Sequence, residues 1–206
     1  MIAIDETKLS AMLDTAGLLA IPSHGYAITC WLNAYFSGTD IAGAEIGVFA
    51  GNVSSYLLKT HPRLKLTMVD AWSPVMPGST LADSGDELVQ LQPETWPIVK
   101  QLAMARTNFA AGRRCVLCGD SVLMADKVNN ESLDFIFIDA DHSYEGCLND
   151  LKAWCPKVKP KGIICGHDYE TPRYPQWGVK RAIRDFGITR PFLGMNYTWC
   201  FPKAWL

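Results

Sequence analysis

Acidic and imidazole side chains follow two apolar stretches of the sequence, Leu133–Ile138 and Gly162–Cys165, each with the composition of a buried strand. These side chains belong to Asp139, Asp141, His142, His167 and Asp168. Because the carboxyl ends of adjacent parallel strands open into one crevice, we expect the five residues to lie near one another. Carboxylates and imidazoles at such distances bind a cation, pair or share protons. Carboxylate oxygens favour Mg²⁺ or Ca²⁺, and the two imidazoles leave Mn²⁺, Fe²⁺ or Zn²⁺ open.

A glycine-containing turn follows an earlier apolar stretch, Ala44–Phe49. Gly47 and Gly51 lack a Cβ, so they allow positive φ and a close approach of the backbone to a ligand. The helix expected next presents free N–H groups to a polar or negative group. Phe49 stands where a dinucleotide-binding turn has its middle glycine, and so large a side chain argues against a pyrophosphate on this turn. Taken alone, the pattern is also that of a plain tight turn.

Two further acids lie at the ends of predicted strands. Asp70 is placed to accept hydrogen bonds from two ribose hydroxyls, or else to cap a helix. Asp120 is placed either to bind an adenine amino group or to cap the helix that follows it. Trp72, two residues after Asp70, stacks on adenine or packs in the core.

Short β-rich apolar runs alternate with helical stretches along most of the chain. The runs are Ala44–Phe49, Leu64–Val69, Arg114–Leu117, Leu133–Ile138 and Gly162–Cys165. The helical stretches are Val53–Thr60, about Thr95–Ala110, Ser121–Val128 and Tyr144–Val158. This alternation predicts a doubly wound α/β fold. At its end we expect a helix over Trp177–Phe186 and an antiparallel pair of strands, Ile188–Leu193 and Tyr197–Phe201.

The 206 residues are expected to form one domain, with a helical cap over residues 1–40 and the α/β core over residues 41–206. An apolar stripe of helical spacing in the cap packs against the sheet edge or forms a lid. It consists of Leu9, Met12, Leu13 and Ala16. The stretch Trp72–Trp96 is rich in proline, and we interpret it as a loop over a ligand or as a surface insertion.

The composition excludes several classes of partner. Net charge is −2 and no block of five like charges occurs, so we expect no nucleic acid and no membrane as a partner. No apolar run approaches the ~20 residues that span a bilayer. Seven cysteines without a regular framework are typical of a reduced protein, and we expect a cytoplasmic location.

In this order, the residues resemble a class I S-adenosylmethionine (SAM)-dependent methyltransferase. The set that carries the resemblance is Glu45–Gly51, Asp70, Gly119–Ser121 and Leu133–His142, and the likeness runs from about Ala44 to the C-terminus. Three segments are similar to those of small bacterial methyltransferases: Asp139–Gly146 (D-A-D-H-S-Y-E-G), Gly166–Tyr169 (G-H-D-Y) and Gly178–Ala182 (G-V-K-R-A). The resemblance implies a Rossmann-like, seven-stranded sheet of order 3-2-1-4-5-7-6 with strand 7 antiparallel.

The resemblance also implies a set of residues that bind SAM. The set is Glu45, Gly47, Phe49, Gly51, Asn52, Asp70, Ala71, Trp72, Gly119, Asp120, Ser121 and Asp139. Within it, the glycine turn flanks the methionine part of SAM, Asp70 holds the ribose, and Asp120 with Ser121 borders the adenine.

Metal-dependent O-methyltransferases of the catechol and caffeoyl-CoA type offer a parallel for catalysis. Asp139 and Asp168 match the first two ligands of their divalent cation, and Tyr169 stands where their asparagine would be. His142 or His167 is the candidate for the third ligand, and we assign His142. In a metal-free site, Asp139 or Asp141 binds the SAM amino group and His142 or His167 is the general base. The expected catalytic set is therefore Asp139, His142, His167 and Asp168.

These observations predict a SAM-dependent methyltransferase that methylates a hydroxyl of a small molecule, with or without a divalent cation such as Mg²⁺. A homodimer is expected because related enzymes form one. Three alternatives stay open at this point. The chain could be an NAD-dependent oxidoreductase, a metal-dependent relative with another chemistry that resembles cephalosporin-hydroxylase-type proteins, or a protein that binds SAM or S-adenosylhomocysteine (SAH) without turnover.

Overall fold

A seven-stranded sheet forms the centre of the part of the chain that the structure, a computed structural model, describes: residues 23–206. Its strands are β1 (Ile41–Ile46), β2 (Leu64–Asp70), β3 (Arg114–Cys118), β4 (Leu133–Ile138), β5 (Val158–Gly166), β6 (Phe192–Leu193) and β7 (Trp199–Pro202). They lie in the order β3-β2-β1-β4-β5-β7-β6. The first five are parallel, and β7 is antiparallel to both β5 and β6. The predicted fold class and strand order are confirmed.

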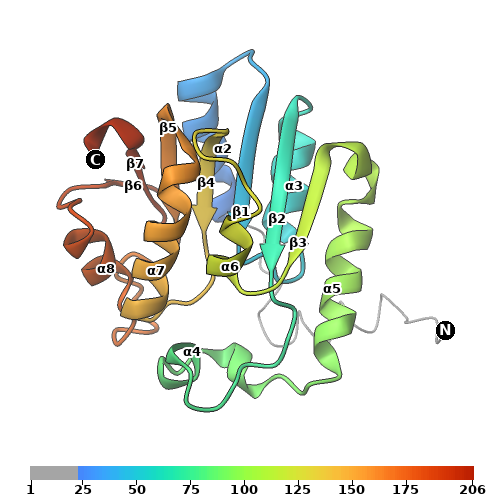
Figure 1. Ribbon diagram of the computed structural model, residues 1–206, viewed down its shortest axis with the longest axis vertical. Helices are drawn as coiled ribbons and strands as arrows, with labels where there is room; N and C mark the ends of the chain where they lie inside the picture. Colours follow the sequence, from blue (N-terminus) through green and yellow to red (C-terminus); the bar gives the residue numbers. More distant parts are fainter. Residues whose placement is uncertain (1–22) are drawn as a thin grey trace.

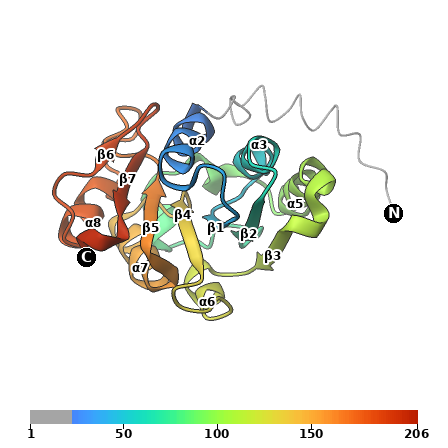
Figure 2. The same cartoon turned by 90° about the horizontal axis from the view of Figure 1, so that it is seen from above.

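Helices cover both faces of this sheet (Figure 2). One face carries α2 (Ser23–Phe36), α3 (Asn52–Thr60) and α5 (Thr95–Arg106), and the other carries α6 (Ser121–Ala125), α7 (Tyr144–Trp154) and α8 (Val179–Asp185). Successive residues of β4 serve the two cores in turn, since Phe135 and Phe137 pack with the first set of helices and Ile136 and Ile138 with the second. This two-sided burial explains why the strand is apolar throughout.

The boundary error that matters most for the site concerns the first strand, which runs over Ile41–Ile46 and not over Ala44–Phe49. The chain turns after Ile46 because Gly47 has φ 91° and Phe49 has φ 47°, neither of which continues a strand. In addition, β5 begins at Val158 and not at Gly162, and β6 begins at Phe192 and not at Ile188. The predicted helices over Thr95–Ala110, Ser121–Val128 and Tyr144–Val158 also end earlier, and a 3₁₀ turn, η2 (Asn108–Arg113), follows the first of them.

The connection between β2 and α5 contains two short elements, α4 (Thr80–Asp83) and the 3₁₀ turn η1 (Glu87–Gln90). Side chains start both of them, since Ser79 accepts a hydrogen bond from the N–H of Ala82 and Asp86 accepts one from the N–H of Leu88. Figure 1 shows α4 beyond the carboxyl ends of the strands, where the arrowheads point. This stretch is therefore placed over the edge of the sheet at which a doubly wound fold binds its ligands.

Helix α2 falls within the predicted helical cap, whereas the apolar stripe from Leu9 to Ala16 lies outside the described residues. Within residues 23–206, no helix combines the length and the hydropathy needed to cross a membrane.

Candidate active site

The turn after β1 is held by a carboxylate from the neighbouring strand. Oδ2 of Asp70 accepts hydrogen bonds from the backbone N–H groups of Val48 (2.9 Å) and Phe49 (2.7 Å), and Oδ1 accepts one from Trp72 (2.7 Å). Burial raises the pKa of Asp70, while these three hydrogen bonds oppose the rise. Asp70 thus organises the turn in this structure, and its predicted contact with a ribose stays a prediction.

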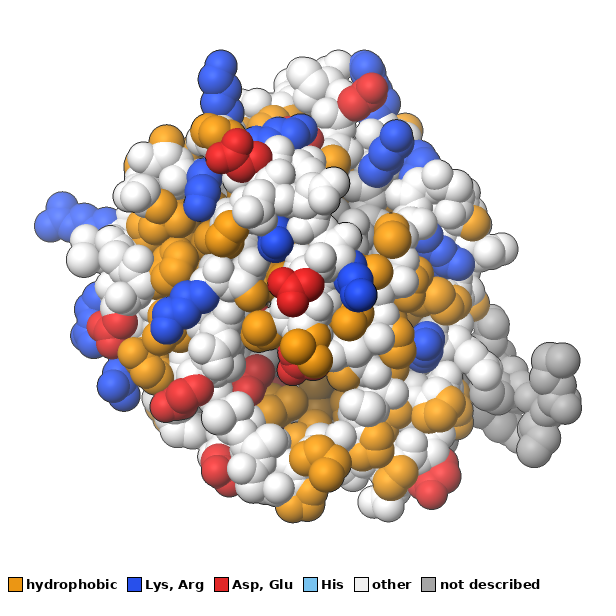
Figure 3. Space-filling view, in the orientation of Figure 1, with side chains coloured by type: hydrophobic (Ala, Val, Ile, Leu, Met, Phe, Trp, Pro, Cys, Tyr) orange, Lys and Arg blue, Asp and Glu red, His pale blue; other side chains and the backbone are white. Residues whose placement is uncertain are grey.

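A first cavity of about 340 Å³ opens beside this turn, at the carboxyl ends of β1 to β4. The predicted cofactor residues in its wall are Gly47, Phe49, Asp70, Ala71, Gly119, Asp120, Ser121 and Asp139. Residues from the connection between β2 and α5 close its outer side, among them Thr80 and Leu81. Figure 3 shows a hollow at this place, with acidic side chains near it. The structure therefore brings together the predicted residues from four different strand ends.

At the predicted adenine end, Asp120 caps helix α6 by accepting a hydrogen bond from the N–H of Leu123 (3.0 Å). The capping interpretation is confirmed, and contact with adenine stays a prediction. The hydroxyl of Ser121 donates to the buried carboxyl of Asp150 on α7. Burial raises the pKa of Asp150 to about 7.

Two predicted cofactor residues pack against other parts of the protein and do not line the first cavity. Trp72 is 6% exposed and packs in the core, where its Nε1 donates to the carbonyl of Phe49 (2.9 Å), so the packing interpretation holds for it. Gly51 has φ 75°, and Ala103 of α5 occupies the space that a Cβ would need there. The missing side chain of Gly51 therefore lets α5 approach the turn closely. Neither residue lines the first cavity.

A second cavity, of about 420 Å³, lies on the other side of the turn and contains the remaining predicted cofactor residues, Glu45 and Asn52. Glu45 is buried and accepts a hydrogen bond from the hydroxyl of Ser54, and burial raises its pKa well above the ordinary value. Gly47, Phe49, Leu88 and Asp139 belong to the walls of both cavities. The turn is therefore the partition between two adjoining spaces.

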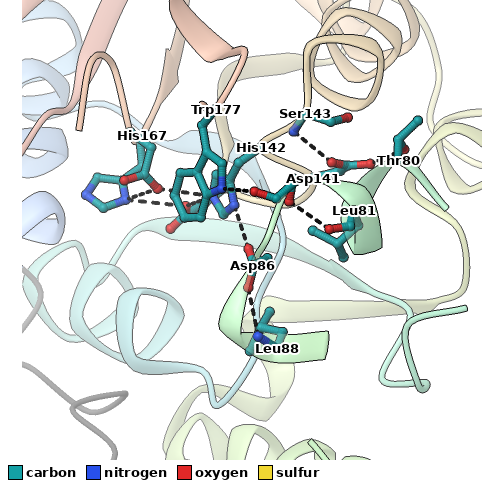
Figure 4. A network of polar contacts seen from close by, with 12 residues as sticks. Thr80, Leu81, Asp86, Leu88, Asp141, His142, Ser143, His167 and Trp177 are labelled. Atoms are coloured by element: carbon teal, nitrogen blue, oxygen red, sulfur yellow. Dashed lines mark hydrogen bonds and ion pairs between the residues drawn. The ribbon is translucent and has the colours of Figure 1, made fainter. Parts of the chain in front are cut away.

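The second cavity contains the predicted catalytic residues in direct contact (Figure 4). Nε2 of His142 lies 3.3 Å from Oδ1 of Asp139 and 3.1 Å from Oδ2 of Asp168. Nδ1 of His167 lies 2.9 Å from the same oxygen of Asp168. Asp139, His142 and Asp168 each offer one ligand atom, and these atoms lie within 4.8 Å of one another. Two carboxylate oxygens and one imidazole nitrogen at this spacing fit a divalent cation.

The charges in this cluster support one another. Burial alone would raise the pKa of both carboxyls, but the imidazoles of His142 and His167 lower the pKa of Asp139 and of Asp168 below the ordinary value. Conversely, burial opposes the charged form of the imidazoles, but the carboxylates raise the pKa of His142 well above its ordinary value and that of His167 to about 10. Imidazoles and carboxylates in this cluster therefore stabilise each other's charged forms.

Asp141 does not join this cluster, contrary to expectation. Its Oδ1 accepts a hydrogen bond from the N–H of Ser143 (2.8 Å), and its Oδ2 accepts one from the hydroxyl of Thr80 (2.6 Å). These bonds turn the side chain toward the start of α7 and the first cavity. The strand pattern alone does not distinguish Asp141 from Asp139, because both lie within three residues of the end of β4, and only the resemblance assigned the ligand position to Asp139.

Several residues of the second cavity were not predicted, among them Asp86, Trp177 and His24. Asp86 lies 2.9 Å from Nδ1 of His142, and the ring of Trp177 is stacked on that imidazole with centroids 4.0 Å apart. His24 lies in α2 with its ring centroid 4.6 Å from that of His167. Burial lowers the pKa of His24. All three residues come from segments without a motif. The one earlier indication concerned Asp86, because we had interpreted Trp72–Trp96 as a loop over a ligand.

The sheet order and the glycine turn next to an acid at the end of β2 are those of the class I methyltransferase fold. The chain belongs to the methyltransferase-domain family, which matches residues 44–169. This match confirms the resemblance inferred from the sequence. It favours methyl transfer over the NAD-dependent chemistry that we kept as an alternative.

Solved structures with this fold cover nearly the whole chain at low sequence identity. A protein of Corynebacterium glutamicum superposes with a TM-score of 0.63 at 16% identity, covering 99% of this chain and 92% of that one. A putative caffeoyl-CoA O-methyltransferase of Staphylococcus aureus gives 0.61 at 15% identity, covering 93% and 90%. The O-methyltransferase of Bacillus cereus in complex with SAH gives 0.59 at 17% identity, covering 98% and 93%. At these identities, the likeness concerns the fold.

Among curated proteins, the uncharacterized protein y4gI of Sinorhizobium fredii is 29% identical over 72 residues. The matched stretch is 35% of this chain but only 8% of that protein's length.

Proposed function

We propose that this protein transfers a methyl group from SAM to a hydroxyl oxygen of a small molecule, with a divalent cation held by Asp139, His142 and Asp168. The position of Asp139 carries the proposal. Its side chain belongs to the wall between the two cavities, so a methyl donor in the first cavity and an acceptor in the second would meet beside it. Methyl transfer requires the reacting atoms to be held at the near-attack distance of about 3–3.5 Å, and two adjoining cavities would allow this.

The methyl donor is assigned to the first cavity. The family match supports methyl transfer, and a structure of the same fold, that of the Bacillus cereus O-methyltransferase, was solved with SAH. SAM supplies a methyl group whose bond to sulfur breaks as the new bond to oxygen forms, and the sulfur keeps the electron pair. Asp70 fixes the turn against which the donor would lie, and Asp120 and Ser121 form the far wall.

The second cavity is assigned to the acceptor and the cation. A bound cation lowers the pKa of a hydroxyl and orients its oxygen. His167 stands beside Asp168 and holds this carboxylate in place. The acceptor's proton needs a neutral base. Of the three imidazoles in this cavity, only that of His24 has its pKa lowered overall, because burial there outweighs the nearby carboxylates, so we assign His24 as the base.

Calorimetric titration of the purified protein with SAH tests the proposal, carried out with Mg²⁺, without Mg²⁺ and after EDTA treatment. We expect SAH to bind in all three cases, and methyl transfer from SAM to a panel of phenols and sugars to require the cation. A protein that binds SAH and methylates a panel member equally well in EDTA would exclude the cation from the mechanism. Absence of SAH binding would overturn the proposed cofactor.

A further inference from the structure

One stretch of chain touches both cavities. Residues 79–88, here called the bridging segment, contain α4 and the start of η1. Ser79, Thr80, Leu81 and Leu88 of this segment line the first cavity. Asp86, Glu87 and Leu88 line the second. A molecule in the first cavity therefore contacts the same segment that borders the cation cluster.

Asp86 is the point at which the bridging segment meets this cluster. Its Oδ1 accepts a hydrogen bond from the N–H of Leu88 (2.8 Å), and its Oδ2 lies 2.9 Å from Nδ1 of His142. The residue is only 6% exposed, so both contacts are shielded from water.

Other contacts fix the bridging segment around His142. The carbonyl of Ser84 accepts hydrogen bonds from Nε2 of Gln176 (3.0 Å) and Nε1 of Trp177 (3.2 Å). The ring of Trp177 in turn lies against the imidazole of His142, with the two planes 9° apart. The hydroxyl of Thr80 donates to Asp141, which is next to His142 in the chain. Figure 4 shows Asp86 below His142 and Thr80 beside Asp141.

This geometry decides which imidazole nitrogen is available to a cation. A carboxylate at Nδ1 accepts the N–H there, so the lone pair of a neutral imidazole is on Nε2. That nitrogen is the one near Asp139 and Asp168, at 3.3 and 3.1 Å. Carboxylates behind a ligating histidine fix its tautomer and ring orientation, and their loss costs about 10–100-fold in metal affinity.

We propose that Asp86 is a positioning residue that holds His142 with Nε2 toward the cation, and that the bridging segment thereby couples cation binding to occupancy of the first cavity. This inference rests on the proposed function, because it requires that a cation binds at Asp139, His142 and Asp168. By linkage, SAH in the first cavity raises the affinity for the cation, and the cation raises the affinity for SAH by the same factor.

Titrations of the full chain with Mn²⁺, followed by the EPR signal of the free ion, test this inference with and without saturating SAH. In the wild-type protein we expect SAH to increase Mn²⁺ affinity at least about fivefold. In Asp86→Ala we expect Mn²⁺ affinity to fall about 10–100-fold, and the effect of SAH on it to disappear. Asp86→Asn retains an oxygen that accepts the N–H of His142, so it should restore part of the affinity that Asp86→Ala loses. Asp83→Asn, an exposed acid of the same segment, is the matched control and should behave as wild type.

The possible results separate this inference from the proposed function. If the wild-type protein binds no Mn²⁺ with or without SAH, the cation site itself is wrong, and both fall. If the wild-type protein binds Mn²⁺ and Asp86→Ala binds it equally well with the same response to SAH, only the role of Asp86 is overturned. SAH titration without Mn²⁺ shows whether Asp86→Ala is folded. If Asp86→Ala is not folded, Asp86→Asn provides the test. An Mn²⁺ affinity and a response to SAH equal to those of Asp83→Asn would then contradict the inference.

Discussion

Three residues of the turn after β1 have positive φ: Gly47 at 91°, Phe49 at 47° and Gly51 at 75°. Position 47 also requires a glycine for steric reasons, because a Cβ there would overlap the carbonyl oxygen of Asp139. For Phe49 the conformation is strained, and the hydrogen bond from its N–H to Asp70 holds it. This backbone conformation places the aromatic side chain of Phe49 in the partition between the two cavities.

Replacing Gly47 by alanine therefore separates steric overlap from backbone strain. Gly38 is the matched control, since it has φ 75° and nothing within 4 Å of an added Cβ. We expect Gly38→Ala to cost about 1–2 kcal/mol of unfolding free energy, the cost of left-handed backbone in a residue with a Cβ. Gly47→Ala should cost more and should also weaken SAH binding. Urea denaturation and SAH titration measure both effects. Equal costs for the two variants would show that Asp139 gives way to the methyl group.

Asp168 has φ 60°, a conformation that asparagine also adopts readily. Asp168→Asn therefore removes one carboxylate from the cluster without disturbing the backbone. We expect its affinity for Mn²⁺ to fall at least about tenfold, because a direct ligand contributes no less than an outer carboxylate does. Its SAH affinity should change little.

Asp185→Asn provides the control for Asp168→Asn, because Asp185 lies at the end of α8 and pairs with Arg184 on the surface. Unchanged Mn²⁺ binding in Asp168→Asn would remove Asp168 from the set of ligands.

At the scale of elements, the strands were predictable and the bridging segment was not. Four of the five parallel strands, β1, β2, β4 and β5, are apolar runs that are buried on both faces of the sheet, and the edge strand β3 is only partly buried. The site residues that directly follow these strands were predicted for the same reason. Asp86 lies 56 residues from His142 in the chain, in a segment with no apolar period, so its contact follows from tertiary packing alone. His24 was missed for a similar reason, because helix α2, which carries it, has only a weak helical period of apolar residues.

Helices α6 and α7 share a buried acid whose ionisation opposes folding. The native state holds the proton of Asp150 up to about pH 7, whereas an unfolded chain releases it near the ordinary value of 3.8. Native Asp150 therefore binds more protons than unfolded Asp150 in this window, and its contribution to stability falls as pH rises from about 4 to 7. Asp150→Asn removes this dependence and keeps an oxygen that accepts the hydrogen bond of Ser121.

We expect Asp150→Asn to gain stability relative to wild type between pH 5 and pH 8, by on the order of 2 kcal/mol. Urea denaturation at both pH values measures the difference, in which the titration of the other groups cancels. Asp126→Asn removes an exposed carboxyl at the end of α6 and should show no such trend. A constant difference between Asp150→Asn and wild type would mean that Asp150 is ionised in the folded protein.

At the scale of the whole molecule, the two cavities differ in which part of the chain builds them. Every residue of the first cavity lies within residues 44–169, the part that matches the methyltransferase family. The second cavity also takes residues from outside this part, namely His24, Thr171, Arg173, Tyr174, Trp177, Asn196 and Tyr197. The common part of the fold thus supplies the proposed cofactor side, and α2 with the chain after β5 supplies the proposed acceptor side. This division explains why the cofactor class was predictable from motifs and the acceptor was not.

The same division predicts how the melting temperature of the protein responds to SAH and to NAD⁺. SAH at 100 times its Kd should stabilise the fold by about 2.7 kcal/mol, which raises the melting temperature of a chain of this size by about 5–10 °C. NAD⁺ at the same concentration should leave it unchanged, because Phe49 occupies the place where a dinucleotide's pyrophosphate would approach the turn. Differential scanning fluorimetry measures both shifts. A rise with NAD⁺ and none with SAH would return the glycine turn to the oxidoreductase interpretation, since the turn and Asp70 suit the ribose of either ligand.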